Sequence, residues 1–124
     1  MKTLGIGVDI VQNNRIRKSI TNENFLLRIF TNDEINKSKK PKNKTAFFSK
    51  RFAAKEAFSK ALGTGFRETL NFKDISITNN ALGKPSIKIN NKLHNIINKK
   101  FKTKKLMYFC QFLMRKSIQL HLLY

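Results

Sequence analysis

Alternation of side-chain type at the start of the chain predicts a buried β-strand over Thr3–Val11. One face of this strand carries four branched apolar residues: Leu4, Ile6, Val8 and Ile10. The opposite face, called the glycine face below, consists of Gly5, Gly7, Asp9 and Val11. Because glycine has no side chain, a second backbone or a ligand can approach the glycine face, and Asp9 emerges on it.

A longer period predicts a helix over Ala46–Leu62. Its apolar residues follow the i, i+3, i+4, i+7, i+8 spacing of an amphipathic helix: Ala54, Ala57, Phe58, Ala61 and Leu62. The segment Gly63-Thr64-Gly65 comes next, and glycine directly after a periodic segment is a typical helix stop. Because alanine is small, we expect this helix to lie close to the glycine face of the first strand.

Shorter segments complete the predicted domain. In chain order they are a helix at Glu23–Phe30, a helix starting at Thr31-Asn32-Asp33-Glu34, a basic loop at Lys37–Lys44, strands at Phe72–Thr78 and Ser86–Ile89 joined by the turn-rich segment Asn79–Pro85, and a short helix at Asn91–Asn98. These elements predict a single α+β domain over residues 1–124, in which an antiparallel sheet packs against one long helix.

The net charge of the chain favours negatively charged partners but does not identify which kind. With 26 basic and 7 acidic residues the formal charge is +19, which attracts nucleic acid, anionic membranes and acidic proteins alike. Lysine-rich segments such as Lys99–Lys105 are also typical of a solvated surface. No apolar run approaches the roughly 20 residues of a membrane-spanning helix, and Asp9 interrupts the leader-like start. We therefore expect a soluble cytoplasmic protein, with the single cysteine, Cys110, as a packing residue.

Charged residues of the long helix and the first strand are candidates for chemistry. Glu56 and Lys60 are four residues apart and share a helix face, while Arg51 and Lys55 lie on neighbouring faces. A Glu/Lys pair at this spacing is by itself typical of an ion pair that only stabilises the helix. Asp9 offers a second hypothesis, because two carboxylates facing each other could hold Mg²⁺, which completes its shell with water and substrate phosphate. The basic residues would then bind phosphate.

Two blocks of sequence resemble a known family. The first is Gly5-Ile6-Gly7-Val8-Asp9-Ile10-Val11 with Arg15-Ile16, and the second is Arg51-Phe52-Ala53-Ala54-Lys55-Glu56-Ala57-Phe58-Ser59-Lys60-Ala61-Leu62-Gly63-Thr64-Gly65. They closely resemble the signature blocks of the holo-acyl-carrier-protein synthase family, at the family's own separation. The region Phe72–Pro85, which ends in Leu82-Gly83-Lys84-Pro85, resembles the family's third block, so the resemblance covers roughly residues 4–89.

This resemblance implies a 4′-phosphopantetheinyl transferase fold and a homotrimer that binds coenzyme A between neighbouring subunits. Its site residues, carried over by position, are Asp9 and Glu56 as Mg²⁺ ligands, Lys60 beside the pyrophosphate, Arg51 on a coenzyme A phosphate, Gly63 and Gly65 against the nucleotide, and Arg15 facing acyl carrier protein. One departure lies nearby: Gln12 stands where many members carry Glu, which concerns hydration of the metal rather than a direct ligand.

The chemistry implied by the resemblance suits these residue types. A serine hydroxyl of apo-acyl carrier protein attacks the phosphoryl group attached to pantetheine and expels 3′,5′-ADP, a step of fatty acid biosynthesis that depends mainly on positioning and charge stabilisation. Mg²⁺ would act as template and Lewis acid, and Lys60 would stabilise the leaving phosphate. Either Glu56 or a metal-bound water would take the serine proton. A positive surface would speed encounter with an acidic carrier protein.

Two alternative functions stay open at this stage. A basic nucleic-acid-binding module fits the charge and the Phe residues among Lys, although the chain has no recognisable DNA- or RNA-binding motif. An inactive family member is the other, because the tail Lys105–Tyr124 lacks the family's Ser-x-Ser-(Asp/His) and Tyr-(Ala/Thr)-x-Ala stretches. On this basis the sheet would lack its usual last strand. His94 and His121 are interpreted as incidental.

We predict that this atypical tail, residues 105–124, arises from a one-base change of reading frame. Joining the last base of each codon to the first two of the next, from Phe109 onward, can spell Leu-Ser-Val-Ser-Asp-Glu-Lys-Lys-Tyr-Thr-Ile-Ala-Phe-Val-Ile, a better strand former that restores the family pattern. The alternative is a genuine strand formed by alternation of Leu106, Tyr108, Cys110, Phe112 and Met114. Sequencing codons 105–124 decides, since codons incompatible with the shifted frame contradict the prediction. If the shift is real, restoring the frame should raise transfer activity.

Overall fold

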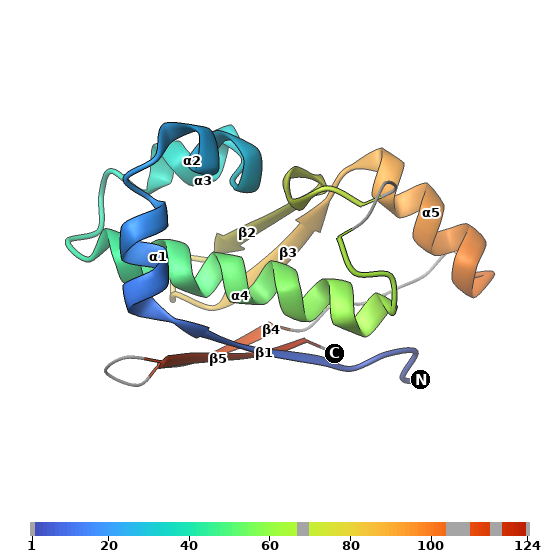
Figure 1. Cartoon of the computed structure of the whole chain (residues 1–124). Helices are drawn as coiled ribbons and strands as arrows, with labels where there is room; N and C mark the ends of the chain where they lie inside the picture. Colours follow the sequence, from blue (N-terminus) through green and yellow to red (C-terminus); the bar gives the residue numbers. More distant parts are fainter. Residues whose placement is uncertain (1, 67–69, 104–109, 115–117, 124) are drawn as a thin grey trace.

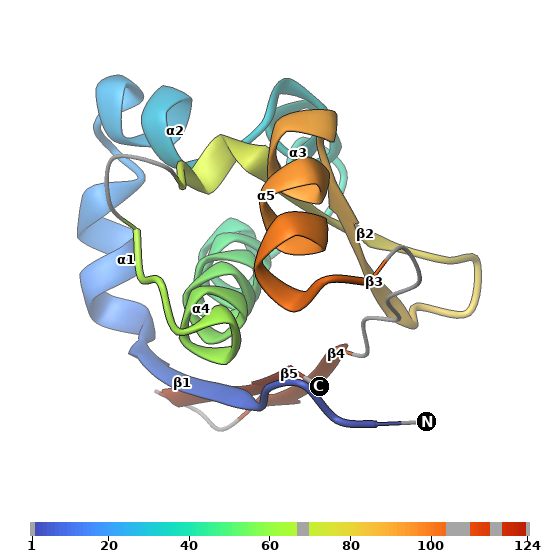
Figure 2. The same ribbon diagram turned by 90° about the vertical axis from the view of Figure 1, so that its right-hand side faces the viewer.

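A long central helix lies between two antiparallel sheets in the computed structural model, which describes residues 2–66, 70–103, 110–114 and 118–123 (Figure 1). This helix, α4 (Lys44–Leu62), contacts a sheet of strand order β1-β5-β4 on one side and the β2-β3 hairpin on another. Figure 2 looks nearly along α4 and shows the first sheet beneath it, with α5 and the hairpin on other sides. The predicted α+β class is confirmed.

The other elements follow the chain in this order: β1 (Gly7–Gln12), α1 (Asn13–Ser19), α2 (Glu23–Ile29), α3 (Asn32–Lys37), then beyond α4 a 3₁₀ helix η1 (Phe72–Asp74), β2 (Ile75–Asn79), β3 (Pro85–Ile89), α5 (Asn91–Phe101), β4 (Cys110–Met114) and β5 (Ile118–Leu123). The predicted helices and hairpin are confirmed, whereas α1 was not expected. Residues 72–74 form η1 rather than strand, because the Asp74 carboxylate accepts from the Asn71 amide at 2.9 Å and closes a turn. No helix among the described residues is long and apolar enough to cross a membrane.

The glycine face of β1 packs directly on α4, as the sequence predicted. A Cβ atom added at Gly5 would lie 2.1 Å from the carbonyl oxygen of Ala61, and one added at Gly7 would lie 1.8 Å from that of Ala57. Both distances are far inside van der Waals contact, so any side chain at these positions would push the strand off the helix. The strand and the helix therefore touch through their backbones.

The opposite face of β1 is more exposed than the prediction of a buried strand implies. Its four apolar side chains are substantially exposed in the single subunit: Leu4 39%, Ile6 60%, Val8 44% and Ile10 62%. Regular pairing also begins at Gly7 rather than at Thr3. Alternation shows which residues share a face of the strand, but not which face is covered. Here α4 covers the glycine face, because only small residues allow its close approach.

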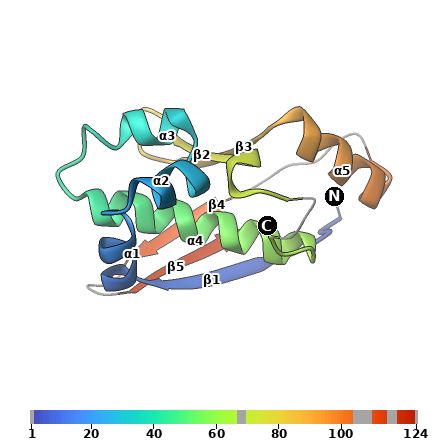
Figure 3. The same ribbon diagram turned by 45° about the horizontal axis from the view of Figure 1, so that its top comes forward.

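The tail corrects a second expectation, that the sheet lacks its last strand. As written, it forms β4 and β5, and β5 pairs antiparallel with β1 from Gly7↔Leu123 to Gln12↔Ile118. Strand β4 pairs with the other edge of β5 (Figure 3). Cys110–Met114 form a strand, as the alternative of a genuine strand expects. Leu106 and Tyr108 lie outside the described residues, as do the side chains of Cys110 and His121. The reading frame itself stays a prediction.

A buried ion pair fixes α4 from its other side. The Glu34 carboxylate of α3 accepts from Lys55 Nζ at 2.7 Å, and neither side chain has solvent exposure. Glu34 also accepts the backbone amides of Thr31 and Ile77, at 2.9 and 2.8 Å, while Lys55 donates to the Ile29 carbonyl at 2.8 Å. Burial is the main reason that the pKa of Lys55 is lowered, with Glu34 opposing that shift. This network joins α3, α4, β2 and the end of α2.

We predict that Lys55→Met destabilises the fold by about 3–5 kcal/mol, because it leaves the Glu34 carboxylate buried and unpaired. The double variant Glu34→Leu/Lys55→Met should be less destabilised than the sum of the two single variants, with a coupling of about 1 kcal/mol or more. Urea denaturation of the four proteins measures these free energies of unfolding. Additive single effects would contradict a coupled pair.

Candidate active site

Asp9 and Lys60 meet at the contact between β1 and α4. Asp9 Oδ1 lies 2.6 Å from Lys60 Nζ, and the side chains are 15% and 53% exposed. Gly5 and Gly7 make this pairing possible, because the close approach of the two backbones brings a short aspartate side chain within reach of the last turn of α4. Lys60 therefore forms an ion pair between the helix and the strand, whereas its spacing from Glu56 suggested a pair along the helix.

Glu56 lies one helical turn before Lys60 and adds a second carboxylate to this cluster. The pKa of Glu56 is raised, first by partial burial and then by the negative charge of Asp9, while Lys60 opposes the shift. A cation close to Glu56 and Asp9 would offset the negative charge that raises the pKa of Glu56. We call Asp9, Glu56 and Lys60 the carboxylate–lysine cluster.

The carboxylate–lysine cluster fits Mg²⁺ in the number and type of its ligands. Among the described residues, no group of three or more His, Cys, Asp or Glu side chains could hold a metal ion. Mg²⁺, however, commonly takes only one or two carboxylates and fills its shell with water and phosphate oxygens. Asp9 and Glu56 are two carboxylates of this kind, close enough for the charge of Asp9 to raise the pKa of Glu56.

Arg51, predicted to bind phosphate, is not brought to the carboxylate–lysine cluster. It is 4% exposed, its guanidinium stacks 3.4 Å from the Phe47 ring centroid, and it donates to Asn79 Oδ1 at 2.9 Å. Arg51 and Glu56 are five residues apart on α4, so their side chains point in directions about 140° apart around the helix axis. Arg51 therefore faces the β2-β3 hairpin rather than Asp9. Burial lowers the pKa of Arg51 to about 10. Its Nε is buried without a hydrogen-bond partner among the described residues, and binding of a phosphate by Arg51 stays a prediction.

Gly63 and Gly65 form an open turn after α4. Both have left-handed backbone angles, with φ of 73° and 63°, which favour glycine. A Cβ at Gly65 would meet no described residue within 4 Å. Between them, Thr64 Oγ1 is buried without a hydrogen-bond partner in the part of the chain that the structure describes. Gly63 is exposed, and contact of this turn with a nucleotide stays a prediction.

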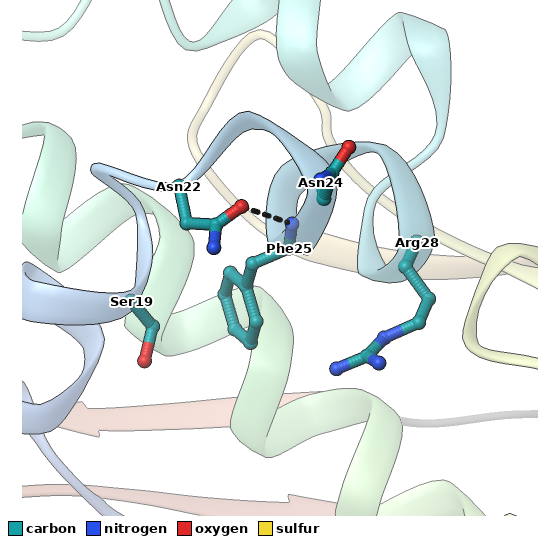
Figure 4. A pocket seen from close by; sticks show the side chains of 5 residues that line it. All are labelled: Ser19, Asn22, Asn24, Phe25 and Arg28. Atoms are coloured by element: carbon teal, nitrogen blue, oxygen red, sulfur yellow. Dashed lines mark hydrogen bonds between the residues drawn. The ribbon is translucent and has the colours of Figure 1, made fainter.

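Arg15 is exposed on α1. A cavity that the sequence did not indicate lies where the end of α1 meets α2. The cavity has a volume of about 300 Å³ and is lined by Ser19, Asn22, Asn24, Phe25 and Arg28 (Figure 4). Its residues come from the end of α1 and from the start and body of α2. Because α1 was not predicted from the sequence, a cavity between these two helices could not be predicted either. The exposed position of Arg15 suits contact with a macromolecule.

The fold and this site define a known class of protein. The family model for the 4′-phosphopantetheinyl transferase superfamily matches residues 5–111, and the chain belongs to that superfamily. The holo-[acyl-carrier-protein] synthase of Pelagibacter ubique is 59% identical over 109 residues, covering 88% of this chain and 85% of that protein.

Solved structures agree with this family. The crystal structure of holo-[acyl-carrier-protein] synthase from Neisseria meningitidis matches with a TM-score of 0.88 and 31% identity, over 98% of this chain and 97% of that one. The holo-(acyl-carrier-protein) synthase from Bacillus anthracis, in complex with CoA (3′,5′-ADP), matches with a TM-score of 0.79 and 33% identity, over 97% and 93% of the two chains.

We predict that Asp9→Asn lowers the pKa of Glu56 and that Lys60→Met raises it, because the first removes a neighbouring negative charge and the second a positive one. Asp33→Asn is the control: Asp33 pairs with Lys37 on the exposed face of α3. Carbon-13 NMR titration of the Glu56 carboxyl measures the pKa in each variant. Equal Glu56 pKa values in all four proteins would show that Asp9 and Lys60 do not share a site with Glu56.

Proposed function

We propose that this chain is a holo-[acyl-carrier-protein] synthase, which transfers 4′-phosphopantetheine from coenzyme A to a serine of apo-acyl carrier protein. The observation that carries the proposal is the carboxylate–lysine cluster, found in a chain that is 59% identical to a holo-[acyl-carrier-protein] synthase. Neither alternative, a nucleic-acid-binding module or an inactive member, is supported by these relatives.

In the proposed reaction, the serine oxygen forms a bond to the phosphorus attached to pantetheine, and the bond from that phosphorus to the 3′,5′-ADP oxygen breaks. Asp9 and Glu56 would hold Mg²⁺, which would supply positive charge to the phosphate oxygens when bound. Lys60, whose ammonium group pairs with Asp9, would stabilise the leaving phosphate as a point charge. The raised pKa of Glu56 favours it as the acceptor of the serine proton.

The partners follow from charge and from the exposed apolar face of β1. A formal charge of +19 favours an acidic partner such as acyl carrier protein, and exposed Arg15 is its proposed contact on α1. Four neighbouring apolar side chains would be costly to leave in water, which supports a subunit interface at β1: Leu4, Ile6, Val8 and Ile10. We propose a cytoplasmic homotrimer with coenzyme A bound between subunits, near Gly63, Gly65 and Arg51.

We predict that Glu56→Gln lowers transfer by about 10²-fold or more, the scale of a lost acid–base or metal-binding group. The loss should not come from unfolding. A carboxyl with a raised pKa in the folded state contributes stability at low pH that disappears as pH rises through the folded pKa, so near neutral pH the ionised form of Glu56 disfavours folding. The melting temperature of Glu56→Gln near neutral pH should therefore match or exceed that of the wild type.

Mass spectrometry of apo-acyl carrier protein incubated with coenzyme A, Mg²⁺ and each variant measures the transfer. Asp33→Asn serves as the control, because it also removes one carboxylate but lies on α3 away from the carboxylate–lysine cluster. Unchanged turnover and unchanged Mg²⁺ dependence in Glu56→Gln would contradict the metal-site assignment. Absence of transfer by the wild type would contradict the proposed function.

A further inference from the structure

Lys100 joins the last turn of α5 to the end of α4. Its Nζ donates a hydrogen bond to the carbonyl of Leu62, the final residue of α4. The same atom lies 3.7 Å from the position that a Cβ would take at Gly63. A residue 38 positions away in the sequence therefore reaches the glycine turn, although no short motif connects them.

An anion at this turn would face an unfavourable field without such a cation. The carboxyl end of a helix carries a negative partial charge, and α4 ends directly at the turn. Lys60 is the basic residue in the last turn of α4, but its ammonium group is paired with Asp9. Lys100 therefore supplies positive charge from a different helix, at the carbonyl where the negative end of α4 lies.

Lys100 keeps hydrogen-bond donors beside this turn. An ammonium group has several N–H donors, and Leu62 uses one. In the turn beside it, a Cβ at Gly65 would meet no described residue within 4 Å, and the buried Thr64 Oγ1 has no hydrogen-bond partner among those residues. Such a polar atom suits a hydrogen bond from or to a ligand. A lysine anchored at one donor retains others for a phosphate oxygen over the turn.

We propose that Lys100 is a coenzyme A-binding residue that holds the end of α4 and supplies a positive charge to a nucleotide phosphate at the Gly63–Gly65 turn. The inference rests on the proposed function and adds to it a residue outside the sequence blocks that resemble the family. It assigns α5 a part in substrate binding as well as in the core.

The first test uses 3′,5′-ADP as the probe, with binding measured by isothermal titration calorimetry. Lys100→Met should weaken this binding about three- to tenfold, the range for a partly exposed charge at a helix end. Lys100→Arg, which keeps charge and donors, should retain most of the affinity. Lys99→Met removes a neighbouring exposed lysine of α5 and should bind like the wild type. Equal affinity of Lys100→Met and Lys99→Met would overturn the inference.

The second test separates substrate binding from loss of structure. Lys100→Met should raise the KM for coenzyme A and leave the KM for acyl carrier protein unchanged, whereas Arg15→Glu should do the reverse. A purely structural role would instead lower the melting temperature and turnover of Lys100→Met without changing the KM for coenzyme A, and that result would overturn the proposal. If Lys100→Met fails to fold, Lys100→Gln keeps a donor without the charge, and wild-type 3′,5′-ADP affinity in that variant would overturn it.

The wild type distinguishes failure of this inference from failure of the proposed function. If wild-type protein neither binds 3′,5′-ADP nor transfers phosphopantetheine, both the function and the inference are contradicted. If the wild type does both and Lys100→Met matches it, only the role of Lys100 is contradicted.

Discussion

Backbone contact between the glycine face of β1 and α4 is the constraint on which the rest of the structure depends. Added Cβ atoms at Gly5 and Gly7 would lie within about 2 Å of α4 carbonyl oxygens, so the two elements can meet in this way only without side chains on that face. This closeness is what allows Asp9, with its short side chain, to reach Lys60 and to influence the pKa of Glu56.

The central helix is held from several directions, which gives the site a rigid support. On one side α4 contacts β1, and on the other Lys55 is fixed by the buried carboxylate of Glu34. Lys55 and Glu56 are adjacent in sequence and have different surroundings, one fully buried and one half-buried. Because a buried ion pair loses its stabilisation when either partner moves, the Glu34–Lys55 pair restricts rotation of α4 about its axis. Glu56 and Lys60 are thereby kept toward Asp9.

The end of α4 illustrates how charge is distributed around a site for an anionic substrate. Lys60 pairs with Asp9, and the carbonyl of Leu62 accepts a hydrogen bond from Lys100 of α5. The strong net positive charge acts over longer distances and is reduced by salt, whereas these two lysines act where the helix ends. Long-range attraction and local placement of charge are thus supplied by different residues.

Much of the fold could be predicted from local patterns. The helix spacing, the glycine stop after Leu62 and the Thr31–Glu34 capping box each depend on a few neighbouring residues, and α4 and α3 were confirmed. The pairing of Gly5 and Gly7 with a small-residue helix was also predictable, since only glycine allows that approach. Helix α1 was not expected because its seven residues, Asn13–Ser19, have neither an N-cap hydrogen bond nor an acidic first turn.

Other features required the tertiary structure, because they depend on which distant groups meet. The sequence placed Asp9, Glu56 and Lys60 together through spacing and resemblance, but the choice of Asp9 as the ion-pair partner of Lys60 depends on how β1 sits on α4. The burial of Arg51 against the hairpin, the pairing of Lys55 with Glu34 and the reach of Lys100 to Leu62 join residues 21 to 38 positions apart. Sequence periodicity reports which residues share a face, whereas burial and pairing are set by the partner that covers that face, and that partner is known only once the chain has folded.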